Sequence, residues 1–393
     1  MKIMIICKYP PIQGGVSAEA YWTANAFAEL GHSVFVLTNA EEVESSYRTE
    51  LDENDKVLLT GFRRKDCIRL RSTTVDKRHV YVPQNNPSIS KLVSIGLEVI
   101  EEFKPDFIYS FYVEPYGVAA MILSKMTGIP YTVRHAGSDI GRLMLTDQLK
   151  TLYRHVFTQA RAVLSTERHY RMFQNLGVAK ERFVRPVSLR LPGDVFHSEG
   201  RKSKLSVITI GMYGKVGKAK GTLQALQALN ILRAEGVFVK FRAHWGGRDL
   251  PEYIKSISDL DLSPDFVVVR SFIPHWRIPV FIRECDIVLF LENNFKIAFH
   301  TPGIPFEVWS CGTHLVTTAE IATKLHIRDF VSDYNCTIIP NTITGKSVAD
   351  AVRQAISKID DGKNEGSDFD ASLQSIISRQ GICNALEQIK TIL

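Results

Sequence analysis

The stretch HTPGIPFEVWSCGT, residues 300–313, carries most of the information about the fold of this 393-residue chain. It predicts a polar loop followed by a short amphipathic helix, with the carboxylate of Glu307 one turn inside that helix. Apolar, strand-like runs lie on either side, at residues 285–291 and 314–318. In α/β proteins this order of strand, loop, helix and strand places ligands at the carboxyl ends of strands. The alternative interpretation is a proline-punctuated loop that only caps a helix.

The N-terminus shows a similar arrangement. Residues 2–7 are an apolar run that predicts a buried strand, and a helical pattern reaches residue 30 before a second strand begins. The loop between them, KYPPIQGGVS at residues 8–17, contains Gly14 and Gly15. Glycine lets the backbone approach a ligand closely, because it has no Cβ. The chain therefore opens with a βαβ unit that has a candidate binding loop at its first turn.

A second half of this kind begins in mid-chain. Residues 207–210 are strand-like and lead into the loop GMYGKVGKAKG, residues 211–221, and a helical run. The loop lacks the Gly-Lys-Ser or Gly-Lys-Thr ending of a Walker A motif, and its glycines do not fit the dinucleotide pattern. It does present three cations at the end of a strand, Lys215, Lys218 and Lys220. Such a loop suits a phosphate-bearing ligand, as does the helix start near residue 303.

Length and periodicity predict an α/β chain of two doubly wound domains. We place them at residues 1–190 and 200–370, with a polar linker that contains Pro192-Gly193 between them. A last helix follows at residues 371–393. A hydrophobic content of 45% and a charged content of 23% are ordinary for a globular α/β protein.

Several of these segments together resemble the retaining nucleotide-sugar glycosyltransferases of the GT-B fold, in particular family four (glycosyl transferases group 1). The opening strand with Gly14-Gly15 resembles the N-terminal signature of that family. Residues 214–221 resemble its Gly-Arg…Lys-Gly segment, and residues 301–312 resemble the second half of its two-glutamate motif. The resemblance implies two Rossmann-like domains with a cleft between them, and a last helix that packs back on the first domain.

The same resemblance implies roles for individual residues. Lys215 and Lys220 take the positions of the two cations that bind the donor diphosphate, and Glu307 that of the glutamate that holds the donor ribose. The segment TVRHAGSD, residues 132–139, resembles an acceptor-side segment with a functional histidine. The implied catalytic residues are His135 and Glu307. The implied donor-binding residues are Gly14, Gly15, Arg134, Lys215, Lys220, Ile273, Thr301, Pro302, Gly303 and Glu307.

One position departs from the family pattern. The first glutamate of the motif would lie eight residues before Glu307, where this chain has Phe299. Some branches of the family lack that glutamate and use a Ser/Thr-Pro-like segment, which Thr301-Pro302 fits. The departure leaves the donor sugar and base open, and it bears on activity.

The resemblance implies transfer of a sugar from a UDP- or GDP-type donor to a hydroxyl acceptor, which is a glycan, a lipid-linked molecule or a small molecule. We expect no cofactor and no metal ion, because the triplets Asp259-Leu260-Asp261 and Asp368-Phe369-Asp370 do not follow the candidate donor loops. One alternative is a GT-B epimerase or hydrolase that acts on the nucleotide sugar alone. Another is a catalytically degenerate binding subunit.

Some polar residues have two interpretations. His275, Trp276 and Arg277 lie where the family receives the nucleobase, and Trp276 serves either there or in ordinary packing. Ser138 and Asp139 act either in the site or as a helix cap. His135 is either a site residue or a core histidine.

The net charge of +6 is concentrated between residues 61 and 80. This segment either contacts an anionic membrane surface or forms a solvated face of the protein. Nucleic-acid binding is not expected, because no reader motif occurs. The sequence begins directly with a strand and has no apolar stretch of membrane-spanning length, so we expect no signal peptide. The expected location is the cytoplasm, with the inner face of the membrane as the peripheral alternative.

Overall fold

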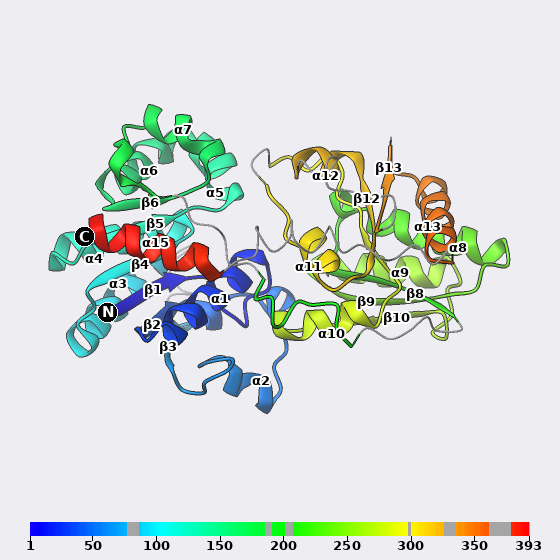
Figure 1. The fold of residues 1–393 in the computed structure, drawn as a ribbon, viewed down its shortest axis with the longest axis horizontal. Helices are drawn as coiled ribbons and strands as arrows, with labels where there is room; N and C mark the ends of the chain where they lie inside the picture. Colours follow the sequence, from blue (N-terminus) through cyan, green and yellow to red (C-terminus); the bar gives the residue numbers. More distant parts are fainter. Residues whose placement is uncertain are drawn as a thin grey trace.

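The computed structural model describes residues 1–76, 86–184, 191–200, 207–297, 300–325, 335–340, 342–360 and 379–392. Two α/β domains lie side by side along the long axis of the molecule (Figure 1). We call them the N-terminal and C-terminal domains.

The N-terminal domain is built on a parallel sheet in the order β3-β2-β1-β4-β5-β6-β7. Its strands are β1 (Lys2–Cys7), β2 (Ser33–Thr38), β3 (Ile68–Ser72), β4 (Phe107–Phe111), β5 (Tyr131–Arg134), β6 (Ala162–Leu164) and β7 (Phe183–Val184). Its helices are α1 (Gly15–Glu29), α2 (Glu53–Leu58), α3 (Ser88–Phe103), α4 (Val118–Thr127), α5 (Gly137–Gly141), α6 (Asp147–Gln159) and α7 (Tyr170–Asn175).

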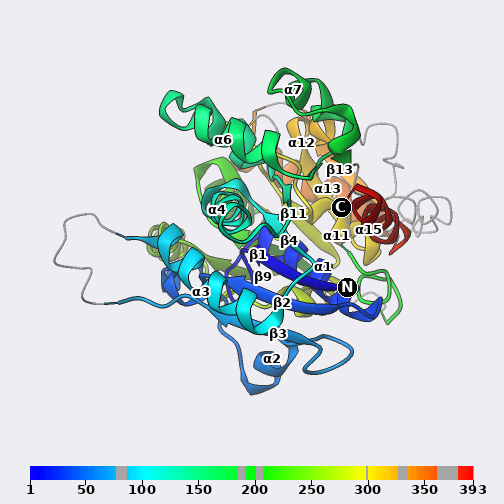
Figure 2. The ribbon, with the colours of Figure 1, turned by 90° about the vertical axis from the view of Figure 1, so that its left-hand side faces the viewer.

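Alternation along β1 explains why helices cover both faces of this sheet. Successive side chains of a strand point to opposite faces. Ile3 and Ile5 pack in a cluster with α1, whereas Met4 and Ile6 pack in a second cluster with α3 and α4. Figure 2 shows α3, α4 and α6 on one side of the sheet and α1 on the other. A continuous apolar run such as residues 3–7 is what a strand buried on both faces requires.

The C-terminal domain contains a second parallel sheet, in the order β10-β9-β8-β11-β12-β13. Its strands are β8 (Ile208–Lys215), β9 (Val239–Gly246), β10 (Val267–Arg270), β11 (Ile287–Phe290), β12 (His314–Thr318) and β13 (Cys336–Ile339). Its helices are α8 (Thr222–Ala234), α9 (Leu250–Asp259), α10 (Ile278–Arg283), α11 (Ile304–Ser310), α12 (Ala319–Lys324) and α13 (Gly345–Asp360).

The strand order reverses once in each sheet, between β1 and β4 and between β8 and β11. These are the topological switch points at which open α/β sheets bind ligands, at the carboxyl ends of the strands. Two sheets of this kind confirm the predicted α/β class with two doubly wound, Rossmann-like domains.

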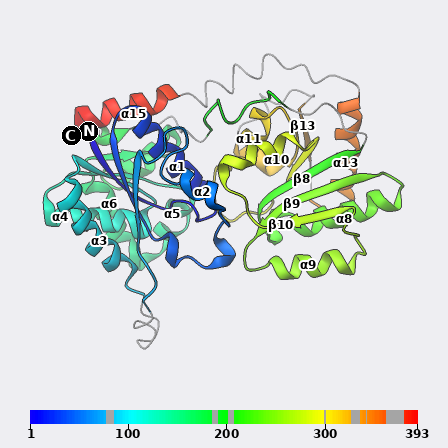
Figure 3. The ribbon, with the colours of Figure 1, turned by 90° about the horizontal axis from the view of Figure 1, so that it is seen from below.

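The last helix, α15 (Arg379–Ile392), lies against α1 and β7 of the N-terminal domain. Figure 3 shows it on that domain, whereas α13 lies on the C-terminal domain. Ala385, Leu386 and Ile389 of α15 are buried in the same cluster as the core side of α1. The chain thus returns to the N-terminal domain at its end.

Aromatic side chains pack across the boundary between the domains. Tyr21 of α1 lies 4.8 Å, between ring centroids, from Trp276 of the C-terminal domain. The Trp276 indole donates to Asp55 of the N-terminal domain at 2.9 Å. Arg277 pairs with the same carboxylate, also at 2.9 Å. No helix among the described residues is long and apolar enough to span a membrane.

Candidate functional site

The two switch points meet at a cluster of lysines. Lys8 directly follows β1, and its ammonium lies 4.4 Å from the ring centroid of Tyr112, which follows β4. Lys215 ends β8 in the other domain. The charge of Lys8 acts on Lys215 across the boundary and lowers its pKa. Cations from both domains therefore share one site, and the sequence analysis did not identify Lys8. Its position directly after the first strand was the available signal.

The ammonium of Lys215 lies among residues of both domains, 4.8 Å from the ring centroid of Tyr47. The side chain is exposed. Partial desolvation of the ammonium, together with the charges of Lys8 and Lys220, lowers the pKa of Lys215 to about 8. Crowded like charges of this kind favour binding of an anion, which relieves their mutual repulsion.

Lys220 has a carboxylate partner that the sequence analysis missed. It pairs with Glu292, a residue that follows β11 and has a buried side chain. The second oxygen of Glu292 lies 3.1 Å from Nε2 of His300. Burial opposes ionisation of Glu292, but His300 and Lys220 outweigh it and hold the pKa below its ordinary value. Glu292 is therefore an ionised carboxylate that orients Lys220. An acid directly after an apolar strand was the signal for it.

Glu307 lies in the first turn of α11, as the sequence predicts, and its carboxylate is buried. Tyr213 of β8 donates its hydroxyl to Oε2 at 2.6 Å, and Nε2 of His275 lies 3.1 Å from Oε1. Burial and the charge of Glu307 raise the pKa of Tyr213 well above its ordinary value, so the phenol stays protonated and donates. These contacts fix the orientation of the carboxylate.

Gly14 and Gly15 lie at the start of α1, with open space around them. The φ of Gly14 is 132°, a conformation that favours glycine. A Cβ at either position would meet no atom of the described residues within 4 Å. Among the described residues α1 has no side-chain cap, and the first N–H groups of a helix have no intrahelical partner.

The remaining predicted donor-binding residues of the C-terminal domain lie just before α11 or after β10. Thr301 is exposed, Pro302 is buried, and Gly303 is the residue before α11. A Cβ on Gly303 would lie 3.2 Å from Oε1 of Glu307, which places this backbone beside that carboxylate. Ile273 follows β10 and is half-buried. Phe299 lies outside the described residues.

Arg134 is placed differently from the lysines. It is buried, its guanidinium pairs with the buried carboxylate of Glu19 in α1, and it lies 4.7 Å from the ring centroid of Phe111. Its charge is thus used inside the N-terminal domain. We leave Arg134 out of the donor site proposed below.

His135 follows β5 and is half-buried. Its Nε2 contacts the hydroxyl of Ser165, and its Nδ1 lies 3.2 Å from the carbonyl oxygen of Ala136. Burial, with a contribution from the nearby His169, lowers the pKa of His135 to about 3. The imidazole is therefore neutral at physiological pH. It can exchange hydrogen bonds but is a weak base.

For Asp139 and Trp276 the structure favours the structural interpretation. Asp139 is buried and accepts N–H groups of Ala136 at 2.9 Å and Val113 at 3.1 Å, which ties the loops after β5 and β4 together. Burial raises the pKa of Asp139 to about 7. Trp276 belongs to the interdomain packing described above, and Arg277 is directed to the N-terminal domain with it.

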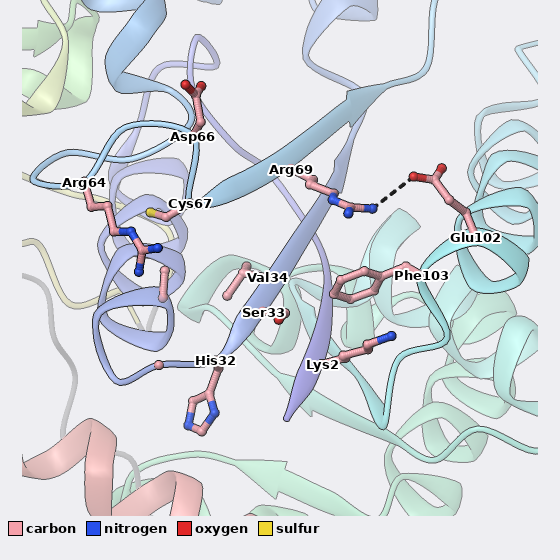
Figure 4. Close-up of a pocket in the computed structure, with 12 residues that line it drawn as sticks. Lys2, His32, Ser33, Val34, Arg64, Asp66, Cys67, Arg69, Glu102 and Phe103 are labelled. Carbon is pink, nitrogen blue, oxygen red and sulfur yellow. Dashed lines mark hydrogen bonds and ion pairs between the residues drawn. The ribbon is translucent and has the colours of Figure 1, made fainter.

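A hollow of about 370 Å³ lies at the opposite end of the N-terminal sheet, by the first residues of β1 and β2. Figure 4 shows Arg69 directed toward Glu102 at its edge, where the two pair at 3.1 Å. Arg63 and Arg71 also pair with carboxylates of the chain. Much of the charge expected to meet a membrane is therefore balanced internally. Lys77 and Arg78 lie outside the described residues.

Two Rossmann-like domains with facing switch points define the class of this protein, which has the GT-B fold. Residues 14–186, which lie in the N-terminal domain, match the model of the glycosyl transferase 4-like domain. No curated protein matches the sequence of the chain.

Solved structures agree with the fold. HepE of Anabaena, in complex with UDP-glucose, has 17% identity and a TM-score of 0.70, with 100% of both chains covered. A glycosyltransferase from Rickettsia africae has 13% identity and a TM-score of 0.62, with 100% of this chain and 98% of that chain covered. A UDP-N-acetylglucosamine 2-epimerase has 11% identity and a TM-score of 0.60, with 93% and 89% covered. At these identities the likeness establishes the fold.

Proposed function

We propose that this protein is a retaining, metal-independent glycosyltransferase that moves a sugar from a UDP- or GDP-type donor to a hydroxyl acceptor. The observation that carries the proposal is the meeting of Lys8, Lys215 and Lys220 from two domains. The carboxylate of Glu307 is anchored by Tyr213, two residues before Lys215 on β8. Clustered cations suit a diphosphate, and a carboxylate, which accepts hydrogen bonds, suits sugar hydroxyls. The complex of HepE with UDP-glucose, in the same fold, supports a nucleotide sugar as the donor.

Each group has a role in such a transfer. Lys215 and Lys220 stabilise the charge that develops on the leaving diphosphate, and the backbone at Gly14 and Gly15 approaches it from the other domain. Glu307 accepts hydrogen bonds from the ribose hydroxyls.

Retention means that the acceptor oxygen replaces the leaving group on the same face of the sugar. The bond from the anomeric carbon to the phosphate oxygen breaks as the bond to the acceptor oxygen forms. The proton of the acceptor hydroxyl passes to the leaving phosphate oxygen, which lies on that face. His135, being neutral, serves the acceptor side as a hydrogen-bonding group.

The residue that tests the proposal is Glu307. Glu307→Gln turns one acceptor into a donor that faces Tyr213 or His275 and removes the charge that the ribose hydroxyls contact. We expect nucleotide-sugar affinity and turnover to fall at least about tenfold, with the fold retained. The matched control is Glu252→Gln, since Glu252 lies exposed in the first turn of α9 of the same domain. Wild-type kinetics with a lowered melting temperature in Glu307→Gln would mean that Glu307 only stabilises the start of its helix.

Turnover of UDP- and GDP-sugars, measured with and without acceptors, separates the alternatives. Sugar transfer with an unchanged anomer in the product supports the proposal. Release of nucleotide or formation of a new epimer without an acceptor indicates a hydrolase or epimerase. Binding without turnover indicates a degenerate subunit.

A further inference from the structure

His275 contacts three separate parts of the molecule. Its Nδ1 lies 2.8 Å from the indole nitrogen of Trp22, in α1 of the N-terminal domain. Its Nε2 lies 3.1 Å from Oε1 of Glu307, in the C-terminal domain. The ring of Phe196, in the segment between the domains, lies 5.0 Å from the His275 ring, centroid to centroid. His275 is therefore a junction between both domains and the connection that joins them.

These contacts determine which nitrogen of His275 carries the proton. An indole N–H only donates, so Nδ1 must accept from Trp22 and cannot hold a proton. The proton of the neutral ring is then on Nε2, which donates it to the carboxylate of Glu307. The hydrogen bond made by one imidazole nitrogen thus sets what the other nitrogen offers. Trp22 has the rigidity that this role requires, because its ring is buried against Tyr21 and Phe62.

We infer that His275 is a positioning residue through which contact between the domains controls nucleotide-sugar binding. Trp22 fixes the Nε2–H tautomer, and that tautomer holds the Glu307 carboxylate in the orientation that receives the donor. The inference rests on the proposed function of Glu307.

The consequence of losing the interdomain hydrogen bond follows from the same chemistry. Without Trp22, the proton of His275 is free to move to Nδ1, and the lone pair of Nε2 then faces a carboxylate oxygen. The Nε2 lone pair and the carboxylate oxygen repel each other. Of Tyr213 and His275, only Tyr213 then still donates to Glu307. Gly14 and Gly15 begin the helix that carries Trp22. Displacement of α1 therefore disturbs both the diphosphate side and the ribose side of the site.

The tautomer is measured directly by ¹⁵N NMR on protein labelled at histidine, with the His275 signals assigned from His275→Asn. In the wild-type protein at neutral pH we expect a protonated Nε2 and an unprotonated Nδ1. In Trp22→Phe, which keeps a ring at the position, we expect the Nδ1–H form or exchange between the two. A wild-type Nδ1–H tautomer would overturn the inference, whatever the protein binds.

The functional consequence is measured by calorimetric titration with UDP. We expect Trp22→Phe and His275→Asn each to raise the dissociation constant about tenfold, because the Glu307 carboxylate loses a fixed donor. The double variant should bind no more weakly than His275→Asn alone, since Trp22 acts only through His275. His275→Gln, whose amide offers a donor to Glu307 without any tautomer, should recover most of the affinity. When Trp22→Phe is added to His275→Gln, the UDP affinity should change little.

The matched control is Trp276→Phe, which removes another indole hydrogen bond across the same boundary, to Asp55. It should lower the melting temperature and leave UDP affinity unchanged. Additive effects of Trp22→Phe and His275→Asn, or wild-type UDP affinity in Trp22→Phe, would overturn the inference while leaving the proposed function intact. If the wild-type protein binds neither UDP nor GDP, the proposed function fails, and the coupling inferred from it fails with it.

Discussion

Lys220 and Arg134 were both predicted to contact the donor, and their partners in the structure distinguish them. The Arg134 side chain is 9% exposed and pairs with Glu19, 115 residues away in the sequence. The Lys220 side chain is 25% exposed and pairs with Glu292, 72 residues away. A paired cation that is still partly exposed, in the turn that precedes α8, can turn to an incoming phosphate. A cation enclosed with its counter-ion is held by that partner, because separating the two would leave an uncompensated buried charge.

Replacing Lys220 tests its contact with the diphosphate. Lys220→Ala removes a charge-assisted hydrogen bond worth roughly 1.5–3 kcal/mol, so UDP affinity should fall at least about tenfold in a calorimetric titration. The variant also leaves the buried carboxylate of Glu292 without its lysine partner, so the melting temperature of the protein should fall.

A second substitution separates these two effects. In Lys220→Ala/Glu292→Gln the unpaired charge of residue 292 is removed. The melting temperature should therefore recover, while UDP affinity stays low. Lys218→Ala, at an exposed position in the same loop, is the control and should be milder in both measurements. Wild-type affinity in Lys220→Ala would exclude Lys220 from the donor site.

The proposed role of Lys215 in donor binding predicts that affinity depends on pH. The charge of a lysine with a pKa of about 8 is present below pH 8 and is lost as pH rises through that value. Affinity for an anionic donor should therefore fall by up to about tenfold between pH 7 and pH 9. Lys215→Arg stays charged throughout this range and serves as the reference. The ratio of the two dissociation constants, measured across the range, should change with pH, and a constant ratio would contradict the assignment.

At the scale of elements, apolar runs in the sequence located the longer strands well but located short strands poorly. The predicted run at 314–318 is β12 (His314–Thr318), and the run at 285–291 contains β11 (Ile287–Phe290). β7 consists of Phe183 and Val184 alone. Two residues have no periodicity of their own, so only pairing with β6 makes them a strand.

The last helix, α15, gives a prediction at this scale. Leu386 is 1% exposed and packs in the cluster that contains the core side of α1. Leu386→Ala should lower the free energy of unfolding by about 2–4 kcal/mol, measured by urea denaturation. Lys390 lies exposed on the same helix and pairs with Glu387. Lys390→Ala should change the free energy by less than about 0.5 kcal/mol. Equal effects of the two substitutions would mean that α15 does not dock as described.

At the scale of the whole molecule, the site is assembled from both domains, which leads to a prediction about metal ions. Lys8 comes from one domain, and Lys215 and Lys220 come from the other. We expect these cations to neutralise the diphosphate of the proposed donor without a divalent ion, so turnover of a nucleotide sugar should persist in excess EDTA. Complete loss of turnover on chelation, restored by magnesium or manganese, would contradict this mechanism.

The sequence by itself determined the two doubly wound domains, because strands buried on both faces and helices with one buried face leave local patterns of spacing. It also indicated the basic loop at residues 211–221 and the position of Glu307 in a helical first turn, since both are local features. The pairing of Lys220 with Glu292 and the tautomer of His275 were decided only by the tertiary structure. They join residues far apart in the chain, and in the case of Trp22 and His275 they join different domains. Spacing along a sequence carries no information about which strand ends will face each other.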